Sequence, residues 1–364
     1  MIGLALDAVY LLAVLATSPL WLYRMVRHGR YRSGWREKLG AAPVRYGLQP
    51  VIWVHCVSLG EANAARTLVD ELHSQLPDYR VVVSSTTDTG MAAAMKLFAP
   101  DHLVFRWPLD LSFCVSRALR RMRPDLVVLM EGEFWPNFLA ACQWRGIPVV
   151  VVNARLGADK GYPRYRALGP LAGKLMFSQL AAVGVQDEVY AERFTALGVP
   201  RDRLHLTGMM KFDTAEVADG VAGAAELATS VGIAPGHKLV VAGGTGPGEE
   251  RMILNFWRDI SSRHAEARLA IVPRKPERFE EVAGLIRSAG FDVVRRSGRL
   301  AGAGELKADA VILGDTMGEL RKFYSVACCV FVGRSLAPMG GSDMIESAAL
   351  GRATAFGPHT FNFP

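Results

Sequence analysis

Residues 51–61, VIWVHCVSLGE, combine an unbroken apolar run with a Ser-Leu-Gly turn, and a helical pattern follows at once over 62–76. The same order of apolar run and helical pattern recurs along the first half of the chain, with strand patterns at 81–86, 103–108, 126–132, 149–154 and 181–186. Strands that are apolar on both faces are typical of a parallel sheet covered by helices on each side. The sequence therefore predicts a doubly wound α/β domain, which we place at residues 39–214.

A second set of strand patterns follows a stretch that lacks one. Residues 215–236 are rich in Gly and Ala and are predicted to be a linker. Beyond it, apolar runs again alternate with helical patterns, at 238–245, 268–274, 291–296, 310–315, 329–335 and 353–358. We expect a second Rossmann-like domain over 237–364, a deep cleft between the two domains, and ligands at the carboxyl ends of both sets of strands.

Length and composition exclude several classes of protein. At 364 residues the chain is too long for one compact core, and its 50% hydrophobic and 21% charged residues exclude long disorder. Five cysteines, an odd number without Cys-x-x-Cys spacing, argue against a disulfide framework and against a zinc site. We expect a folded protein of two domains in a reducing compartment.

The N-terminal segment is apolar and is followed by most of the excess positive charge. Residues 2–22, IGLALDAVYLLAVLATSPLWL, approach the length that spans a bilayer, and residues 24–38 hold six Lys/Arg against one acid. This order is typical of a membrane segment with its cytoplasmic flank. We predict a membrane anchor and basic flank over 1–38; a buried N-terminal helix and a signal peptide stay open as alternatives. Much of the +7 net charge comes from this one segment and is not spread over a binding face, which argues against a nucleic-acid partner.

Carboxylates stand in two loops that follow strands of the first domain. Gly60 is expected to permit a tight turn, and Glu61 is expected at a helix N-terminus, where the helix dipole favours its ionised form. The alternative for Glu61 is an ordinary capping residue. Residues 131–137, EGEFWPN, place two more acids beside an aromatic pair; here the alternative is an acidic turn with a packed Trp.

The second domain contains turns that suit an anionic ligand. Residues 243–250, GGTGPGEE, match neither a Walker A motif nor a dinucleotide-binding turn. Arg274 ends a strand between two prolines, a rigid position for presenting a guanidinium to phosphate or carboxylate. Gly340 and Gly341 precede a helical pattern, and free N–H groups there suit phosphate.

Eight motifs in order resemble those of the Kdo transferases, glycosyltransferases of lipopolysaccharide synthesis that move 3-deoxy-D-manno-octulosonic acid (Kdo) from CMP-Kdo to a lipid A precursor. They are VSLGE, EGEFWPN, NARL (153–156), TGMMKFD (207–213), VPRKPERF, GDTMGEL, GGSDMIESAA (340–349) and FGPHTFNF (356–363). The resemblance implies the two-domain GT-B fold, an inverting transfer at the cytoplasmic face of the inner membrane, and no metal or cofactor. The chain ends soon after the last motif, and we expect further C-terminal helices in the whole protein.

The resemblance also implies roles for individual residues. Glu61 matches the family's general base. The donor side comprises Arg274, Met317, Gly318, Glu319, Ser335, Gly340, Gly341, Asp343 and Glu346. The acceptor side, or the closure of the two domains, comprises Gly60, Glu133, Arg155 and Lys211; ion pairs at the surface or between domains are the alternative for the last three.

The motifs depart from the family pattern at a few positions. Gly246 stands where the family has His, Lys275 where His is common, Arg334 inside a usual Gly-Gly-Ser, and Ser342-Asp343 in place of His-Asn. These positions surround the expected donor site. Two other functions therefore stay open: a GT-B enzyme that uses another nucleotide sugar such as UDP-N-acetylhexosamine, and a non-catalytic protein that binds nucleotide or lipid at a membrane surface.

Overall fold

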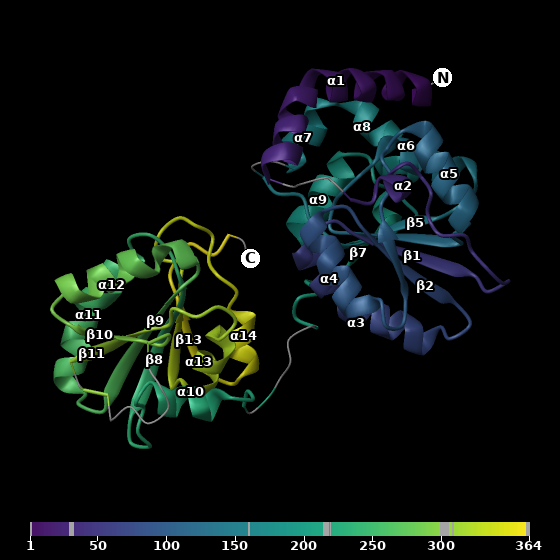
Figure 1. Cartoon of the computed structure of the whole chain (residues 1–364). Helices are drawn as coiled ribbons and strands as arrows, with labels where there is room; N and C mark the ends of the chain where they lie inside the picture. Colours follow the sequence, from purple (N-terminus) through teal and green to yellow (C-terminus); the bar gives the residue numbers. More distant parts are fainter. Residues whose placement is uncertain are drawn as a thin grey trace. The chain divides into compact units, whose positions relative to one another are not determined.

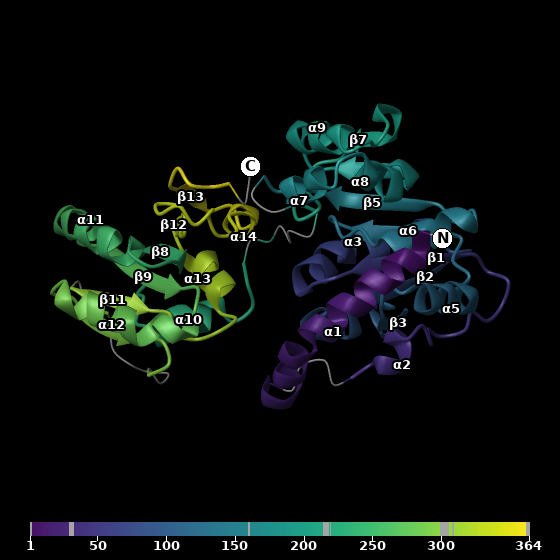
Figure 2. The same cartoon turned by 90° about the horizontal axis from the view of Figure 1, so that it is seen from above.

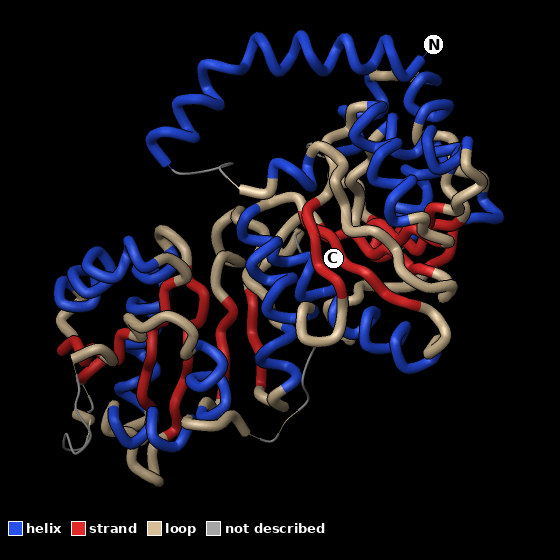
Figure 3. Tube along the Cα trace, turned by 45° about the vertical axis from the view of Figure 1, so that its right-hand side comes forward, coloured by secondary structure: helices blue, strands red, loops and turns tan. Residues whose placement is uncertain are grey.

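The computed structural model describes residues 2–28, 33–158, 161–213, 218, 220–298, 306–307 and 309–361. The chain divides into two compact units, Met1–Thr214 and Ala215–Pro364 (Figure 1). Each unit is a parallel sheet with helices on both faces (Figure 3). This architecture confirms the prediction of two α/β domains; the cleft between them stays a prediction.

Unit 1 is built on a seven-stranded parallel sheet in the order β3-β2-β1-β4-β5-β6-β7. Its strands are β1 Val51–Cys56, β2 Arg80–Ser85, β3 Leu103–Arg106, β4 Leu126–Met130, β5 Val149–Ala154, β6 Ala182–Val185 and β7 Leu204–Leu206. In register, Trp53 of β1 lies between Val82 of β2 and Val127 of β4. The direction of strand addition reverses between β1 and β4, so their connections leave in opposite directions and open a space above the carboxyl ends.

Helices cover both faces of this sheet. They are α1 Ile2–His28, α2 Trp35–Lys38, α3 Leu59–Gln75, α4 Asp88–Phe98, α5 Ser112–Met122, α6 Pro136–Trp144, α7 Gly161–Ala167, α8 Pro170–Leu175 and α9 Glu188–Ala196, with short 3₁₀ turns at η1 Phe177–Gln179 and η2 Arg201–Arg203. Alternate residues of β1 enter different apolar clusters: Trp53 packs on one face and Val54 on the other. Both faces of the sheet are thus core, which explains why its strands are apolar throughout.

Unit 2 has a six-stranded parallel sheet in the order β10-β11-β9-β8-β12-β13. The succession β11, β9, β8, β12, β13 can be followed in Figure 2. Its strands are β8 Lys238–Thr245, β9 Ala267–Pro273, β10 Asp292–Arg295, β11 Ala310–Leu313, β12 Cys329–Val332 and β13 Ala353–Phe356. Its helices are α10 Ala224–Ser230, α11 Glu249–Arg263, α12 Phe279–Ser288, α13 Leu320–Val326 and α14 Ile345–Ala349, with a 3₁₀ turn at η3 Pro276–Arg278. Here the order of strand addition reverses between β8 and β12.

The predicted strands are all present, and two assignments need correction. Residues 204–206 form an additional edge strand, β7, which pairs with β6. The predicted linker 215–236 is too long, because α10 lies within it and buries Leu227 in the core of unit 2, where Val231 also packs. An amphipathic helix in a Gly/Ala-rich stretch is weakly patterned, and its packing on the second sheet decides the boundary.

Helix α1 contacts the rest of unit 1 through polar side chains. Asp7 Oδ1 accepts hydrogen bonds from Ser112 N and from Asn137 Nδ2, both at 2.9 Å, and Tyr10 Oη donates to Asp110 at 3.0 Å. Among the described residues, no helix has both the length and the continuous apolar character needed to span a bilayer. The membrane-anchoring role of 1–38 therefore stays a prediction.

Candidate functional site

The carboxyl ends of β1 and β4, where strand order reverses in unit 1, bring two of the predicted motifs together. The turn after β1 carries Glu61 on the first turn of α3, and the loop after β4 carries Glu131 and Glu133. Parallel neighbouring strands end at the same edge of a sheet, so the loops 57–61 and 131–135 are adjacent. The sequence analysis placed both loops after strands but did not predict that they are neighbours.

Glu61 is buried and held by its own turn. Ser58 is the N-cap of α3: its Oγ accepts from Glu61 N at 3.3 Å and donates to Glu61 Oε1 at 3.0 Å. Val57 N donates to Glu61 Oε2 at 2.7 Å. This reciprocal arrangement is a variant of the capping box in which the returning backbone bond comes from Val57, the residue before the N-cap, so the alternative role as a capping residue describes the local geometry.

The pKa of Glu61 goes in the direction opposite to the expectation from the helix dipole. Burial raises it to about 7, and the nearby carboxylates of Glu131 and Glu133 add to the rise. The hydrogen bonds from Val57 and Ser58 favour the ionised form but only partly offset burial. A carboxylate with a pKa near neutrality is a better proton acceptor than an ordinary glutamate, which suits a general base.

Glu131 is a site residue that the sequence reasoning left unassigned. Its Oε2 accepts from Arg155 Nε and Nη2, both at 2.8 Å, which gives Arg155 the ion pair that was its alternative reading. The backbone of Glu131 is left-handed, with φ of 60°, and Asn153 at the end of β5 has φ of 54°. Strained backbone at non-glycine residues concentrates at functional sites, and a positive φ leaves no pattern in a single sequence.

The remaining residues predicted for the acceptor side have different surroundings. Gly60 has no left-handed φ, and a Cβ there would meet only Ser58 Oγ at 3.9 Å, so the turn does not require glycine. Lys211 is half-buried in the segment after β7, where Met210 N donates to Asn153 Oδ1 at 3.2 Å. This segment thus reaches β5, next to the loop that carries Glu131 and Glu133.

In unit 2 a single buried carboxylate organises the corresponding edge of the sheet. Glu249, the first residue of α11, is fully buried. Its carboxylate accepts from Gly246 N at 2.9 Å, Ser335 N at 2.8 Å, Leu336 N at 2.9 Å and Arg334 N at 2.5 Å. It therefore joins the glycine turn after β8 to the loop after β12, at the point where strand order reverses.

Arg274 lies at this edge with an exposed guanidinium that makes no hydrogen bond or ion pair to the described residues. Its charge affects two groups nearby. Burial and Asp343 raise the pKa of Glu346, while Arg321 and Arg274 partly offset that rise. Tyr324 on α13 is fully buried, which raises the pKa of its hydroxyl, and Glu346, Asp343 and Arg274 also act on this pKa. The hydroxyl has no hydrogen-bond partner in the described part of the chain. Arg274 and Asp343 thus lie near enough to Glu346 to affect its pKa, and the donor-binding role of the three residues stays a prediction.

The glycine turn before α14, predicted to suit phosphate, has several of its N–H groups bonded within the protein, and its phosphate role stays a prediction. Gly340 and Gly341 have φ of 85° and 83°, but Gly341 N donates to Arg334 O at 2.8 Å. Asp343 Oδ1 accepts from Ile345 N at 2.9 Å and so satisfies the first N–H of α14. Because these donors are used internally, the turn offers few free N–H groups. Ser335 is likewise engaged: its Oγ donates to Val332 O and accepts from Gly357 N.

The loop between β11 and α13 carries the other predicted donor residues. The Met317 side chain is 68% exposed, and Gly318, with φ of 82°, has open space above it. Glu319 accepts from Arg296 at 3.1 Å and from Thr316; although burial favours the neutral acid, these bonds lower its pKa. Glu319 is therefore an anchored anion beside an open surface.

Several of the departures from the family pattern contact one another. A Cβ at Gly246 would lie 2.6 Å from Met339 Sδ and 3.1 Å from Arg334 Cγ. Ser342 Oγ donates to Gly244 O at 2.9 Å, and a Cβ at Gly244 would lie 2.7 Å from Ser342 Oγ. The space beside the turn is thus filled by the side chains of Met339 and Arg334, which would have to move if position 246 carried a side chain.

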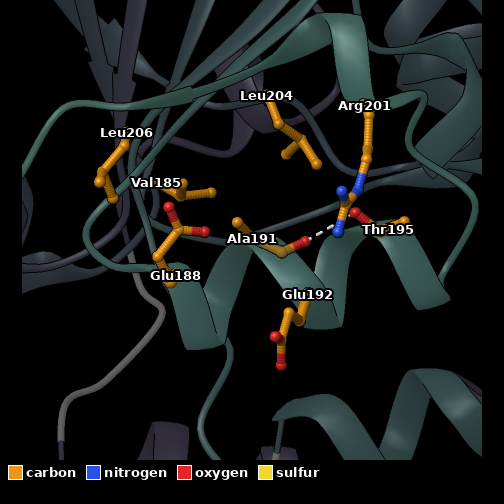
Figure 4. A pocket seen from close by; sticks show the side chains of 8 residues that line it. All are labelled: Val185, Glu188, Ala191, Glu192, Thr195, Arg201, Leu204 and Leu206. Carbon is orange, nitrogen blue, oxygen red and sulfur yellow. Dashed lines mark hydrogen bonds between the residues drawn. The ribbon is translucent and has the colours of Figure 1, made fainter.

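One hollow on the described surface lies apart from the predicted site residues. A hollow of about 240 Å³ lies along α9 and the β7 edge, lined by Glu188, Glu192 and Arg201 among others (Figure 4). None of its lining residues belongs to a predicted site. The described residues contain no cluster of three or more His, Cys, Asp or Glu side chains arranged to hold a metal ion.

Comparisons with known proteins agree with this geometry. The family model for 3-deoxy-D-manno-octulosonic-acid transferase (kdotransferase) matches residues 33–214. A 3-deoxy-D-manno-octulosonic acid transferase of Haemophilus influenzae is 33% identical over 348 residues, 93% of this chain and 78% of the relative. That of Bordetella pertussis is 34% identical over 385 residues, 98% of this chain and 84% of the relative.

A solved glycosyltransferase of Rickettsia africae shares the two-domain fold, with a TM-score of 0.54 at 10% identity over 85% of this chain and 79% of that chain. The matches to the two curated transferases cover 93% and 98% of this chain and so extend across both units. The chain therefore belongs to the 3-deoxy-D-manno-octulosonic acid (Kdo) transferase family, glycosyltransferases that transfer Kdo in lipopolysaccharide synthesis.

Proposed function

We propose that this protein is an inverting transferase that moves Kdo from CMP-Kdo to a lipid A precursor, with Glu61 as general base. The observation that carries the proposal is the burial of Glu61 at the end of β1, which raises its pKa to about 7. The family membership supplies the sugar that is transferred.

The proton has a defined route in this reaction. Glu61 accepts the proton of the acceptor hydroxyl while that oxygen forms a bond to the anomeric carbon of Kdo. The bond from this carbon to the CMP phosphate breaks, and the electron pair leaves with CMP. Attack from the face opposite the leaving group inverts the anomeric centre. A base with pKa near the working pH is ionised in part of the molecules and still basic enough to take the proton.

The donor carries two anionic groups, the phosphate of CMP and the carboxylate of Kdo. Arg274 is the exposed cation that faces the Glu346 and Asp343 cluster, and its planar guanidinium suits either anion. In this proposal Glu346 accepts hydrogen bonds from the ribose hydroxyls. The open surface at Met317 and Gly318 suits the flat cytosine ring.

A related donor sugar is the second candidate. It is favoured by the filled space beside Gly246, where Met339 and Arg334 occupy the position of a family histidine. Thermal shift with CMP, CDP and UDP separates the donor classes, because a nucleotide that binds the native protein stabilises it. Stabilisation by CMP supports the CMP-sugar proposal; a larger effect of UDP than of CMP contradicts it.

We also propose that α1 lies at the cytoplasmic face of the inner membrane. Its middle exposes apolar side chains, including Leu11, Leu12 and Leu15 at 57%, 66% and 71%. The basic residues of 24–38 follow this apolar stretch and suit anionic lipid headgroups. Such a location brings the enzyme to a lipid acceptor.

The role of Glu61 is tested by Glu61→Gln. The amide keeps the shape of the side chain but accepts no proton at neutral pH, so turnover should fall by about 10² or more. Binding of CMP should stay within about twofold, because Glu61 lies in unit 1 and the predicted nucleotide residues lie in unit 2. A variant that folds normally and retains near-normal turnover contradicts the assignment.

A further inference from the structure

A cavity of about 370 Å³ lies within unit 1, beside the loop after β4. Leu6 and Tyr10 of α1 line one part of it, and Leu168, Leu171 and Leu175 around α8 line another. Most of its remaining lining is aromatic or aliphatic. The volume lies in the range of small-ligand sites, and the lining suits a hydrocarbon group rather than a sugar.

Two charged side chains, Glu133 and Arg164, belong to the lining. Burial raises the pKa of Glu133, and the nearby positive charge of Arg164 partly offsets this rise. Trp135, which also lines the cavity, has a buried Nε1–H without a hydrogen-bond partner in the described residues. The cavity therefore combines an apolar interior with a cation, and one of its lining residues has an unused donor.

The cavity and the candidate base Glu61 have one neighbour in common, Glu133. Glu133 both lines the cavity and contributes to raising the pKa of Glu61. A molecule that enters the cavity beside Glu133 can therefore present a neighbouring group to Glu61. The sequence motif EGEFWPN supplies both features, because its acids raise the pKa of Glu61 while Glu133, Phe134 and Trp135 line the cavity.

We infer that this cavity receives an acyl chain of the lipid acceptor, with Arg164 holding an anionic group of the acceptor's head. The inference rests on the proposed function, which supplies a lipid acceptor. The charge and the donor fit the occupant: a phosphate pairs with Arg164, and the ester or amide carbonyl of an acyl chain accepts from Trp135 Nε1. The apolar chain is thereby placed so that the head group lies at Glu61.

Binding is tested first with a brominated fatty acid of medium chain length, because bromine quenches tryptophan fluorescence on contact. Wild-type full chain should show quenching that is lost in Trp135→Phe. Leu171→Asp, at a side chain 55% exposed, should weaken the binding about tenfold, because a charge enters the apolar lining. Leu168→Asp, 49% exposed, gives the same test if Leu171→Asp folds poorly.

Val189→Asp is the matched control, since Val189 lies on α9, is 51% exposed and lies outside the cavity. It should bind the brominated acid as wild type does. Quenching that is unchanged in both leucine variants, with melting curves showing that they fold, overturns the cavity as an acyl site. Equal weakening in Val189→Asp overturns it as well.

Transfer assays then distinguish the source of the chain. Two acceptors with the same phosphorylated head are compared, one acylated and one deacylated. Leu171→Asp should raise KM for the acylated acceptor about tenfold and leave the reaction of the deacylated one unchanged. Equal changes for both acceptors assign the cavity to another lipid and overturn the inference. If wild type transfers to neither acceptor, the proposed function fails, and the fluorescence result decides the nature of the cavity by itself.

Discussion

The environment of Glu61 determines its chemistry. An exposed glutamate is ionised well below neutral pH and is a weak base, whereas burial beside two other acids gives Glu61 a pKa of about 7. The capping-box hydrogen bonds orient the carboxylate without restoring an ordinary pKa. The capping role and the proposed role as general base therefore belong to the same residue.

The first prediction concerns the pH dependence of transfer. Because a general base must be deprotonated, kcat/KM should fall as pH drops through about 7, the pKa of Glu61. Glu131→Gln removes a negative charge that raises this pKa and leaves Arg155 without its partner. Both changes favour the ionised form, so the acidic limb of the profile should move to lower pH.

Glu71→Gln is the control for this shift, because Glu71 lies on α3 away from the turn and hydrogen-bonds to Gln75. Its profile should match that of wild type. A profile of Glu131→Gln that coincides with wild type, or moves to higher pH, contradicts the electrostatic account of Glu61.

The second prediction concerns the buried hydroxyl of Tyr324, which has no partner among the described residues. Removing an unpaired buried hydroxyl removes its desolvation penalty, so Tyr324→Phe should stabilise unit 2 by about 1 kcal/mol or more. Tyr10→Phe should have the opposite sign in unit 1, because Tyr10 donates to Asp110 at 3.0 Å. Urea unfolding of both variants tests the pair; destabilisation by Tyr324→Phe means that its hydroxyl is satisfied in the native protein.

Sequence reasoning located Glu61 and Arg274 but not all of their properties. The pKa of Glu61 depends on burial by segments distant in sequence, and the dipole argument, which uses only the local helix, gave the opposite sign.

At the scale of elements, the turn after β8 and the loop after β12 depend on one carboxylate. Glu249 accepts four backbone N–H groups from these two segments, and it is fully buried. Such an arrangement stabilises a loop pair that has little regular structure of its own. The positions of Ser335 and the glycine turn therefore follow from Glu249.

The third prediction is that Glu249→Gln destabilises unit 2 by about 3 kcal/mol or more, because the amide NH₂ faces backbone donors and one acceptor oxygen is lost. Glu226→Gln on α10 is the control, since Glu226 is exposed in the same unit. Denaturant unfolding should show a large shift for the first variant and almost none for the second. Equal stabilities contradict the role of Glu249 as the link.

The strands were predictable because each fills a two-sided core, as Trp53 and Val54 illustrate in β1. Short elements were not. The edge strand β7 has three residues, and α10 gains its stability by burying Leu227 against the second sheet. Neither carries a pattern long enough to be recognised without its tertiary contacts.

At the scale of the whole molecule, two separately packed units share the functions that the proposal requires. Unit 1 contains Glu61, the acyl-chain cavity and α1, and unit 2 contains Arg274 with the Glu346 cluster. Two curated transferases match across both units. The proposal thus assigns acceptor chemistry and donor recognition to different halves of the chain.

The last prediction concerns how this molecule reaches a membrane. Helix α1 is held to unit 1 by Asp7 and Tyr10, whereas Leu11 and Leu15 are 57% and 71% exposed and contribute little to folding. The double variant Leu11→Asp, Leu15→Asp should therefore move the protein from the membrane to the soluble fraction while its melting temperature stays within a few degrees of wild type. Burial of two leucines in lipid is worth about 3 kcal/mol or more, which corresponds to a loss of partitioning of about a hundredfold.

Asp7→Ala separates attachment of the helix from its affinity for lipid. It removes the acceptor for Ser112 N at the start of α5, so unit 1 should be destabilised by about 1 kcal/mol, as for loss of a helix cap. The exposed leucines are unchanged in this variant, and it should remain in the membrane fraction. Fractionation with a melting curve for each variant is the measurement. If the double leucine variant stays with the membrane at high salt, the contact lies elsewhere on the molecule, and the exposed face of α1 requires another explanation.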